Sequence, residues 1–212
     1  ARKSGQGDLT ISGGQVTLIS GGDGAAAAGS LSVTGGETLI VSGGGSENRS
    51  YGEGSESWGL WGGLPQQSPQ GEEPPIPERE TPVAASAHGL SAGKSMNLSG
   101  GAITLDCSDS ALYSAGALLL SGSAVTVSGG DTALSAQGQL TLSAGDVTVL
   151  TARRGVAAEG MTVSGGTLSV SSAEEGLVLS GGYPAEETGT PSDARRMTVT
   201  GGTLSVCSGT PT

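Results

Sequence analysis

Apolar and polar residues alternate in short runs along this chain, and the runs recur in a fixed order. Each copy holds an apolar–polar–apolar run, a Ser or Thr, a small pair and a second alternating run, as in MTVSGGTLSV at 161–170 and MTVTGGTLSV at 197–206. Such short alternation predicts β-strands, because successive strand side chains point to opposite faces. The first small residue of the pair marks the seven copies at Gly13, Gly35, Gly100, Gly122, Ala144, Gly165 and Gly201.

The spacing of these copies is regular once two insertions are allowed for. Four of the six intervals are 22, 22, 22 and 21 residues, and those of 65 and 36 contain one period plus an insertion. A period of this length, with three short segments in each copy, predicts an all-β solenoid of about seven turns. We expect a single unit over 1–212, with inserted loops at 43–93 and 183–196.

The expected core consists of the aliphatic positions on either side of each small pair. In one copy these are Met161, Val163, Leu168 and Val170, which alternation places on a common face. The equivalent positions elsewhere are Leu9, Ile11, Val16, Leu18, Met96, Leu98, Ile103, Leu105, Leu118, Leu120, Val125, Val127, Leu140, Leu142, Val147, Val149, Met197, Val199, Leu204 and Val206.

The small pair and the second copy are special cases of this pattern. A Gly pair permits the positive φ of a corner and a close approach of neighbouring turns. In the second copy, GGETLIV offers either Thr38 and Ile40 or Leu39 and Val41 to the core, and a bulge is expected there.

Four stretches combine the repeated phrase with the short third segment: AHGLSAGKSMNLSGGAITLDCSDSALYSAG, GGDTALSAQGQLTLSAGDVTV, ARRGVAAEGMTVSGGTLSV and AEEGLVLSGG. Through them the chain resembles the secreted bacterial carbohydrate-binding-domain proteins, over about residues 8–42 and 86–206. This resemblance implies a right-handed parallel β-helix, similar in fold to pectate lyases but not an enzyme. It also implies a secreted or cell-surface protein that binds a pectin-type or cellulose-type polysaccharide and carries calcium.

In that family, acidic residues of the short third segment form a ladder that can hold calcium. The matching positions here begin with Asp23 and are interrupted by the Ala87–His88 and Arg153–Arg154 copies. Calcium requires six to eight oxygen ligands. The alternative is that these acids cap corners and keep the molecule soluble. The candidate ligands are Asp106, Asp109, Asp131, Glu174 and Glu175.

Candidate sugar-binding residues are Trp58, Trp61 and Tyr113. Aromatic faces stack on sugar rings, so the two Trp of SESWGLWGG could form a platform on the inserted loop. Alternatively, they lie on the stack and cover an apolar strip or a sheet edge.

Charge and residue types exclude several other functions. The net charge of −11 and pI near 4.3 disfavour nucleic acid, and no apolar run is long enough to span a membrane. The single histidine, His88, lacks a recognisable nucleophile and is expected to face solvent. Arg153 and Arg154 are expected to pair with acids such as Asp131 or Glu174.

The cysteines and the ends of the chain supply two further expectations. Cys107 and Cys207 lie four turns apart, roughly 19 Å at the strand spacing, so they are predicted to be free thiols or to form an intermolecular link. Neither end shows a capping helix, which favours a fragment of a longer solenoid or copies that stack head to tail. Ice binding would need a regular Thr array, and the outward positions vary too much for it.

Overall fold

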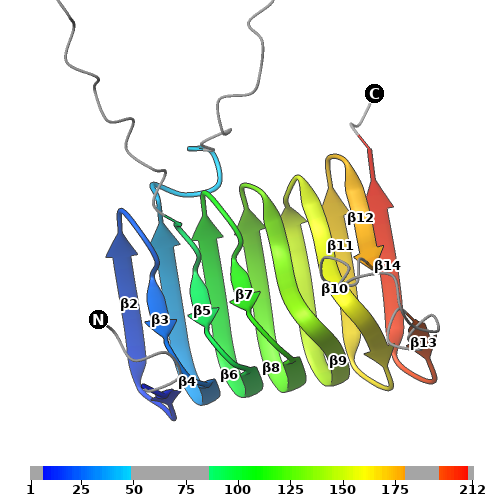
Figure 1. Ribbon diagram of the computed structural model, residues 1–212, viewed down its shortest axis with the longest axis horizontal. Helices are drawn as coiled ribbons and strands as arrows, with labels where there is room; N and C mark the ends of the chain where they lie inside the picture. The colour runs from blue at the N-terminus through cyan, green and yellow to red at the C-terminus, as the bar shows by residue number, and fades with distance from the viewer. Residues whose placement is uncertain (1–6, 49–85, 180–195, 210–212) are drawn as a thin grey trace, which may run out of the picture.

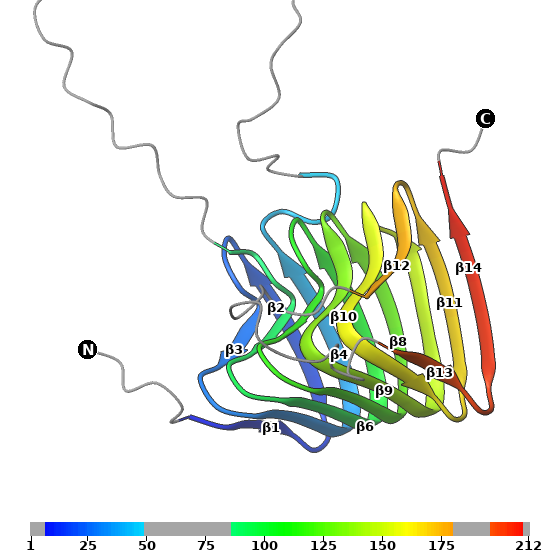
Figure 2. The same cartoon turned by 45° about the vertical axis from the view of Figure 1, so that its right-hand side comes forward.

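The computed structural model describes residues 7–48, 86–179 and 196–209. These residues form an all-β structure of fourteen strands in one sheet that curls around an elongated apolar core (Figures 1 and 2). No helix long and apolar enough to cross a membrane occurs in these three ranges. In chain order the strands are β1 (Leu9–Ile11), β2 (Gln15–Ser20), β3 (Ala25–Ala27), β4 (Leu31–Ser42), β5 (Leu90–Ala92), β6 (Met96–Cys107), β7 (Leu112–Ser114), β8 (Leu118–Gly129), β9 (Thr132–Thr151), β10 (Arg154–Val163), β11 (Thr167–Ser172), β12 (Glu175–Leu179), β13 (Met197–Val199) and β14 (Thr203–Ser208).

Each strand pairs in parallel with the equivalent strand of the neighbouring copy. Met96 of β6 lies opposite Leu118 of β8, which in turn lies opposite Leu140 of β9. The same equivalence holds across both insertions, because Leu31 pairs with Met96 and Met161 pairs with Met197. The two nearly identical segments 161–170 and 197–206 are therefore neighbours in the sheet.

Most of the predicted aliphatic positions form the core, stacked like on like, but Val199 and Val206 are exposed and the prediction is wrong for them. Leu98, Leu120 and Leu142 occupy successive rows of one column and are fully buried. Burying a side chain of this size contributes about 1.5–3 kcal/mol relative to leaving it exposed. Strand alternation thus aligns the aliphatic columns that hold the copies together.

Most corners between the long strand segments have a glycine with positive φ, although Ser123 occupies this position in β8. Gly101 has a φ of 83°, and a Cβ at this position would lie 2.7 Å from the carbonyl oxygen of Gly36 in the preceding copy. Both the positive φ and the close approach exclude larger residues. The expectation for the Gly pair is confirmed at this corner.

In the second copy, Thr38 and Ile40 face the core and Leu39 faces outward. The stretch from Glu37 to Ser42 pairs without a break with both β2 and β6, and the register irregularity between β4 and β6 lies at the corner before Glu37. The inward orientation of Thr38 lowers stability, because its hydroxyl is buried without a hydrogen-bond partner.

Both described ends of the long insertion are fastened to the sheet. The Ser42 hydroxyl donates to the carbonyl of Ala87 at 2.8 Å, and the Ser46 N–H donates to Asp106 Oδ1 at 2.7 Å. Residues 90–92, at the end of the range expected to be inserted, form β5 and pair with β3 and β7. The segments before and after the insertion therefore belong to the same stack.

Candidate functional site

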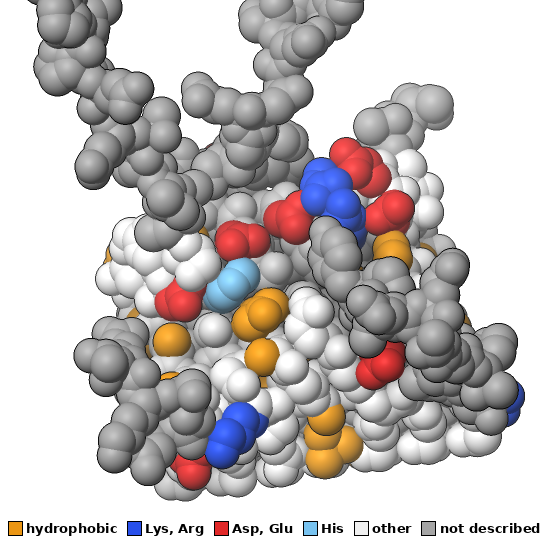
Figure 3. Space-filling view, viewed as in Figure 1, with side chains coloured by type: hydrophobic (Ala, Val, Ile, Leu, Met, Phe, Trp, Pro, Cys, Tyr) orange, Lys and Arg blue, Asp and Glu red, His pale blue; other side chains and the backbone are white. Residues whose placement is uncertain are grey.

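The short strands form a narrow face with small outward side chains. In β5, β7 and β9, parallel pairing aligns Ser91, Tyr113 and Ser135 in one outward column. Ala26 of β3 and Ala157 of β10 extend this column. Tyr113 is thus a large aromatic side chain whose neighbours in this column are small. Figure 3 shows this face, with the molecule's single histidine in pale blue and carboxylates in red around it.

His88 stacks on Tyr113 from the preceding copy. The two ring centroids are 4.8 Å apart and the rings are within 6° of parallel. The backbone N–H of His88 donates to Asp23 Oδ1 at 3.0 Å, which fixes the segment that carries the imidazole. The side chain of His88 is only 14% exposed, so the expectation that it faces solvent is wrong. Most of the ring is covered because it lies against the aromatic surface of Tyr113.

Asp109 completes this cluster. Its Oδ2 lies 3.4 Å from His88 Nδ1, and its side chain is 36% exposed. Nδ1 is buried and forms no hydrogen bond of good geometry, so the two groups lie close together without a hydrogen bond between them. We call Tyr113, His88 and Asp109 the aromatic cluster. It presents a ring surface, an imidazole edge and an accessible carboxylate side by side.

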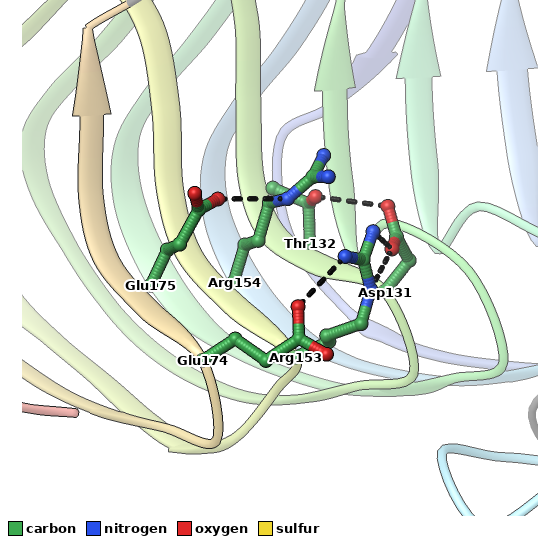
Figure 4. Close-up of polar contacts among 6 residues, drawn as sticks. All are labelled: Asp131, Thr132, Arg153, Arg154, Glu174 and Glu175. Carbon is green, nitrogen blue, oxygen red and sulfur yellow. Dashed lines mark hydrogen bonds and ion pairs between the residues drawn. The ribbon is translucent and has the colours of Figure 1, made fainter. Parts of the chain in front are cut away.

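A second group of charges adjoins this cluster at the starts of β9, β10 and β12 and just before them (Figure 4). Arg153 donates from Nε to Asp131 Oδ1 at 2.7 Å and from Nη1 to Glu174 Oε2 at 2.9 Å, and its Nη2 also contacts Asp131. Arg154 Nε lies 3.0 Å from Glu175 Oε2, an ion pair without the alignment of a hydrogen bond. The predicted pairing of these arginines with neighbouring acids is confirmed.

The electrostatics of Arg153 follow from these contacts. Burial alone would lower the pKa of its guanidinium, but hydrogen bonds and charges from Asp131 and Glu174 outweigh burial and raise the pKa. The Thr132 hydroxyl donates to the other oxygen of Asp131 at 3.0 Å. Both oxygens of Asp131 therefore already have partners within the protein.

Comparison with protein families gives one match. The model of the carbohydrate-binding domain-containing protein family matches residues 1–133, more than half of the 212-residue chain. This chain belongs to that family. The matched range contains the whole aromatic cluster and Asp131. No curated protein and no solved structure matches the chain.

The carboxylates predicted as calcium ligands in this carbohydrate-binding family member do not fit a calcium site as they are placed. Asp106 accepts the N–H of Ser46, Asp109 faces His88, and Asp131, Glu174 and Glu175 face arginines. Within the described ranges, no three His, Cys, Asp or Glu side chains gather closely enough to hold a metal ion. Calcium needs several converging oxygens, whereas here each of these acids faces a partner within the protein. Calcium binding therefore stays a prediction, and no step below depends on it.

The remaining predicted positions are divided between described and undescribed parts of the chain. Trp58 and Trp61 lie outside the described residues. Cys107 and Cys207 are both free, the first buried and the second exposed, as predicted from their separation along the stack. Sequence reasoning named Tyr113 but missed its partner His88. The period carried the relevant signal, since 22 residues beyond His88 is position 110, close to Tyr113 in the next copy.

Proposed function

We propose that this chain is a non-catalytic polysaccharide-binding module that folds as a right-handed parallel β-helix of about seven turns. It acts outside the cell or at a bacterial cell surface. Membership of the carbohydrate-binding family supports the binding role. The parallel pairing of equivalent residues from copy to copy supports the helical winding.

The proposed sugar-binding site is the aromatic cluster. The observation that carries the proposal is the stack of His88 on Tyr113 beside the accessible carboxylate of Asp109. A tyrosine ring can pack against the C–H face of a pyranose, and a carboxylate accepts hydrogen bonds from sugar hydroxyls. The small side chains of Ser91 and Ser135 on either side give a glycan chain room to approach the ring.

The test is retention on insoluble polysaccharide. We expect the protein to be retained on cellulose or pectin, and Tyr113→Ala to reduce retention at least tenfold with little change in melting temperature. Leu150→Ala is the matched control, because it removes a large apolar side chain that is 56% exposed elsewhere on the molecule. Absence of retention on any glycan would refute the function, and equal retention of the two variants would refute this site.

Trp58 and Trp61 remain candidates for a second contact with the glycan. Replacing both with Ala distinguishes the two alternatives for them. Lost binding at an unchanged melting temperature supports a sugar platform, whereas a lowered melting temperature supports a cover over the stack. The same retention assay with and without a chelator tests calcium dependence.

Self-association through the end of the stack is a second candidate function. Val199 and Val206 of the last described copy are 51% and 40% exposed, whereas their equivalents Val163 and Val170 are buried. An open row of core side chains favours end-to-end contact with another copy. Rods that lengthen with concentration would support this function. A sharp monomer peak across a hundredfold dilution series would exclude it.

A further inference from the structure

The outer face of the long strands carries a column of hydroxyl side chains with one interruption. Parallel pairing aligns Thr17 of β2, Leu39 of β4, Thr104 of β6, Thr126 of β8 and Thr148 of β9. Leu39 is 43% exposed, because Thr38 and Ile40 on either side of it face the core. The core packing of the second copy thus places one apolar side chain within an outward row of threonines.

In the neighbouring outward column, the side chains become smaller between β4 and β6. This column contains Gln15, Glu37, Ala102, Ala124 and Asp146 on the same strands. Ala102 is exposed and has only a methyl group, whereas the adjacent Glu37 and Leu39 are long. The small side chain of Ala102 borders a groove of about 380 Å³ between β2, β4 and β6. The side chains along it are those of Gln15, Thr17, Glu37, Leu39, Ala102 and Thr104.

This groove is separate from the aromatic cluster. The cluster lies on the face of the short strands β5 and β7, whereas the groove is lined by outward residues of β2, β4 and β6. These long strands lie behind β5 and β7 in Figure 1. Two sites on opposite faces would contact different chains of a polysaccharide network, or different segments of one chain.

The groove combines an apolar surface with a fixed polar rim. Gln15 Nε2 donates to Glu37 Oε2 at 2.9 Å across the two strands, which orients both side chains. A carboxylate and an amide have further acceptor and donor positions beyond this one bond, and Thr17 and Thr104 add hydroxyls. Leu39 and Ala102 supply the apolar part. A pyranose ring has the matching character, with C–H faces and a rim of hydroxyls.

The negative charge of the groove favours uncharged sugars over anionic ones. Among the described residues, Glu37 is the only charged side chain lining it, and the whole chain carries a net charge of −11. A uronate or sulfated ring would bring a second anion next to this carboxylate, and no described lining residue is a cation that could neutralise it. An uncharged ring meets no such repulsion.

We propose that this groove is a second saccharide site that binds uncharged sugar rings and rejects polyuronates. The inference rests on the proposed carbohydrate-binding function and extends it to a site and a substrate class. The groove's volume lies within the range of small-molecule sites in proteins. It is large enough for a short piece of glycan.

The experiment titrates the full chain with cellotriose, which is uncharged, and with trigalacturonate, which is anionic. Backbone amide chemical shifts report where each probe binds. Cellotriose is expected to shift the amides of Leu39, Ala102 and Thr104, and trigalacturonate to leave them unchanged. Glu37→Gln is expected to weaken the discrimination between the two probes by about tenfold at low salt, since it removes the charge and keeps the shape.

Ala102→Leu and Ala124→Leu form a matched pair of variants. Both positions are exposed and lie opposite one another in β6 and β8, but only Ala102 lines the groove. Ala102→Leu is expected to weaken cellotriose binding at the groove at least tenfold, and Ala124→Leu to change it less than twofold. Thermal melting checks that both variants are folded.

The outcomes separate this inference from the proposed function. Shifts confined to the surroundings of Tyr113, with equal affinities for the two Ala variants, would overturn the groove and leave the function standing. Shifts at the groove that Ala102→Leu removes support the inference. Stronger binding of trigalacturonate than of cellotriose at the groove would overturn the proposed selectivity, and no shifts with either probe would overturn both proposals.

Discussion

At the scale of single residues, charges within the stack are balanced by protein side chains. Arg153 lies between Asp131 of the preceding copy and Glu174 of the following one and contacts both. Without it, two acids would flank an uncharged position in one column, and like charges at this spacing repel. The sequence could predict this pairing, because the 21- to 22-residue period aligns the three positions. The bridging geometry depends on side-chain rotamers, which periodicity does not specify.

Arg153→Met is expected to lower the free energy of unfolding by about 0.5–1 kcal/mol at low salt, the range for solvent-accessible ion pairs. The side chains involved are 25–55% exposed, so solvent screens the interaction and the difference should shrink at high salt. Urea unfolding at two salt concentrations measures both effects. Arg154→Met is the control, since it removes a single pair. Equal losses for the two variants would contradict a special role for Arg153.

Cys107 makes stability depend on alkaline pH. Burial raises the pKa of its thiol from 9.0 to about 11, and a hydrogen bond with Ser42 opposes part of this rise. A pKa that is higher in the folded state means that the fold favours the protonated thiol. Its contribution to stability is therefore complete below pH 9 and is lost as pH rises toward 11.

The expected loss is about 2–3 kcal/mol of unfolding free energy between these pH values, at 1.36 kcal/mol per pKa unit. Urea unfolding at pH 8, 9.5 and 11 measures it. Cys107→Ala should remove this part of the pH dependence, whereas Cys207→Ala, at an exposed position, should not. The same slope in all three proteins would show that other groups cause it.

At the scale of strands and corners, the Gly pair sets how closely neighbouring copies approach. Gly14 and Gly101 both have positive φ, at 79° and 83°. A Cβ at Gly14 would meet nothing within 4 Å, whereas one at Gly101 would lie 2.7 Å from the carbonyl oxygen of Gly36. The two positions share a backbone conformation and differ in packing.

Gly14→Ala is expected to cost about 1 kcal/mol, because only the left-handed backbone is strained. Gly101→Ala should cost a further 1–3 kcal/mol or so, since backbone of the neighbouring copy must also move. Chemical denaturation of both variants measures the difference. Equal costs would mean that conformation alone, and not close approach, requires glycine at these corners.

At the scale of the whole molecule, stability depends on position along the stack. Leu120 lies in the middle and is fully buried between equivalents on both sides. Leu204 belongs to the last described copy and is only partly buried. In a structure held by contacts between neighbouring copies, a central side chain has two packing partners and a terminal one has fewer.

Leu120→Ala is therefore expected to cost 2–5 kcal/mol or so, the usual range for a buried leucine. Leu204→Ala should cost roughly 1 kcal/mol, because less of its surface is buried. Thermal or urea unfolding measures both. A cost for Leu204→Ala as large as that for Leu120→Ala would indicate that the end of the stack is covered, for example by a second copy.

The candidate sites were predictable from sequence to different degrees. Tyr113 was a candidate from sequence because it is an aromatic residue, and the period places it near His88. The stacking of the two rings was not predictable, because it depends on how the segment before β5 is held by Asp23. The groove was hidden as well, since the alternation in GGETLIV left open whether Leu39 faces inward or outward.

The sequence by itself determined the parallel stack and its aliphatic columns, because a repeat of fixed length with strand alternation aligns equivalent residues over one another. It also determined the corners at which glycine adopts a positive φ, as at Gly14, Gly101 and Gly145. Only the tertiary structure decided which carboxylates face arginines, that His88 lies on Tyr113, and that Leu39 borders a groove. These features depend on contacts between side chains of different copies. Periodicity fixes the positions of their backbones, but packing fixes the directions of their side chains.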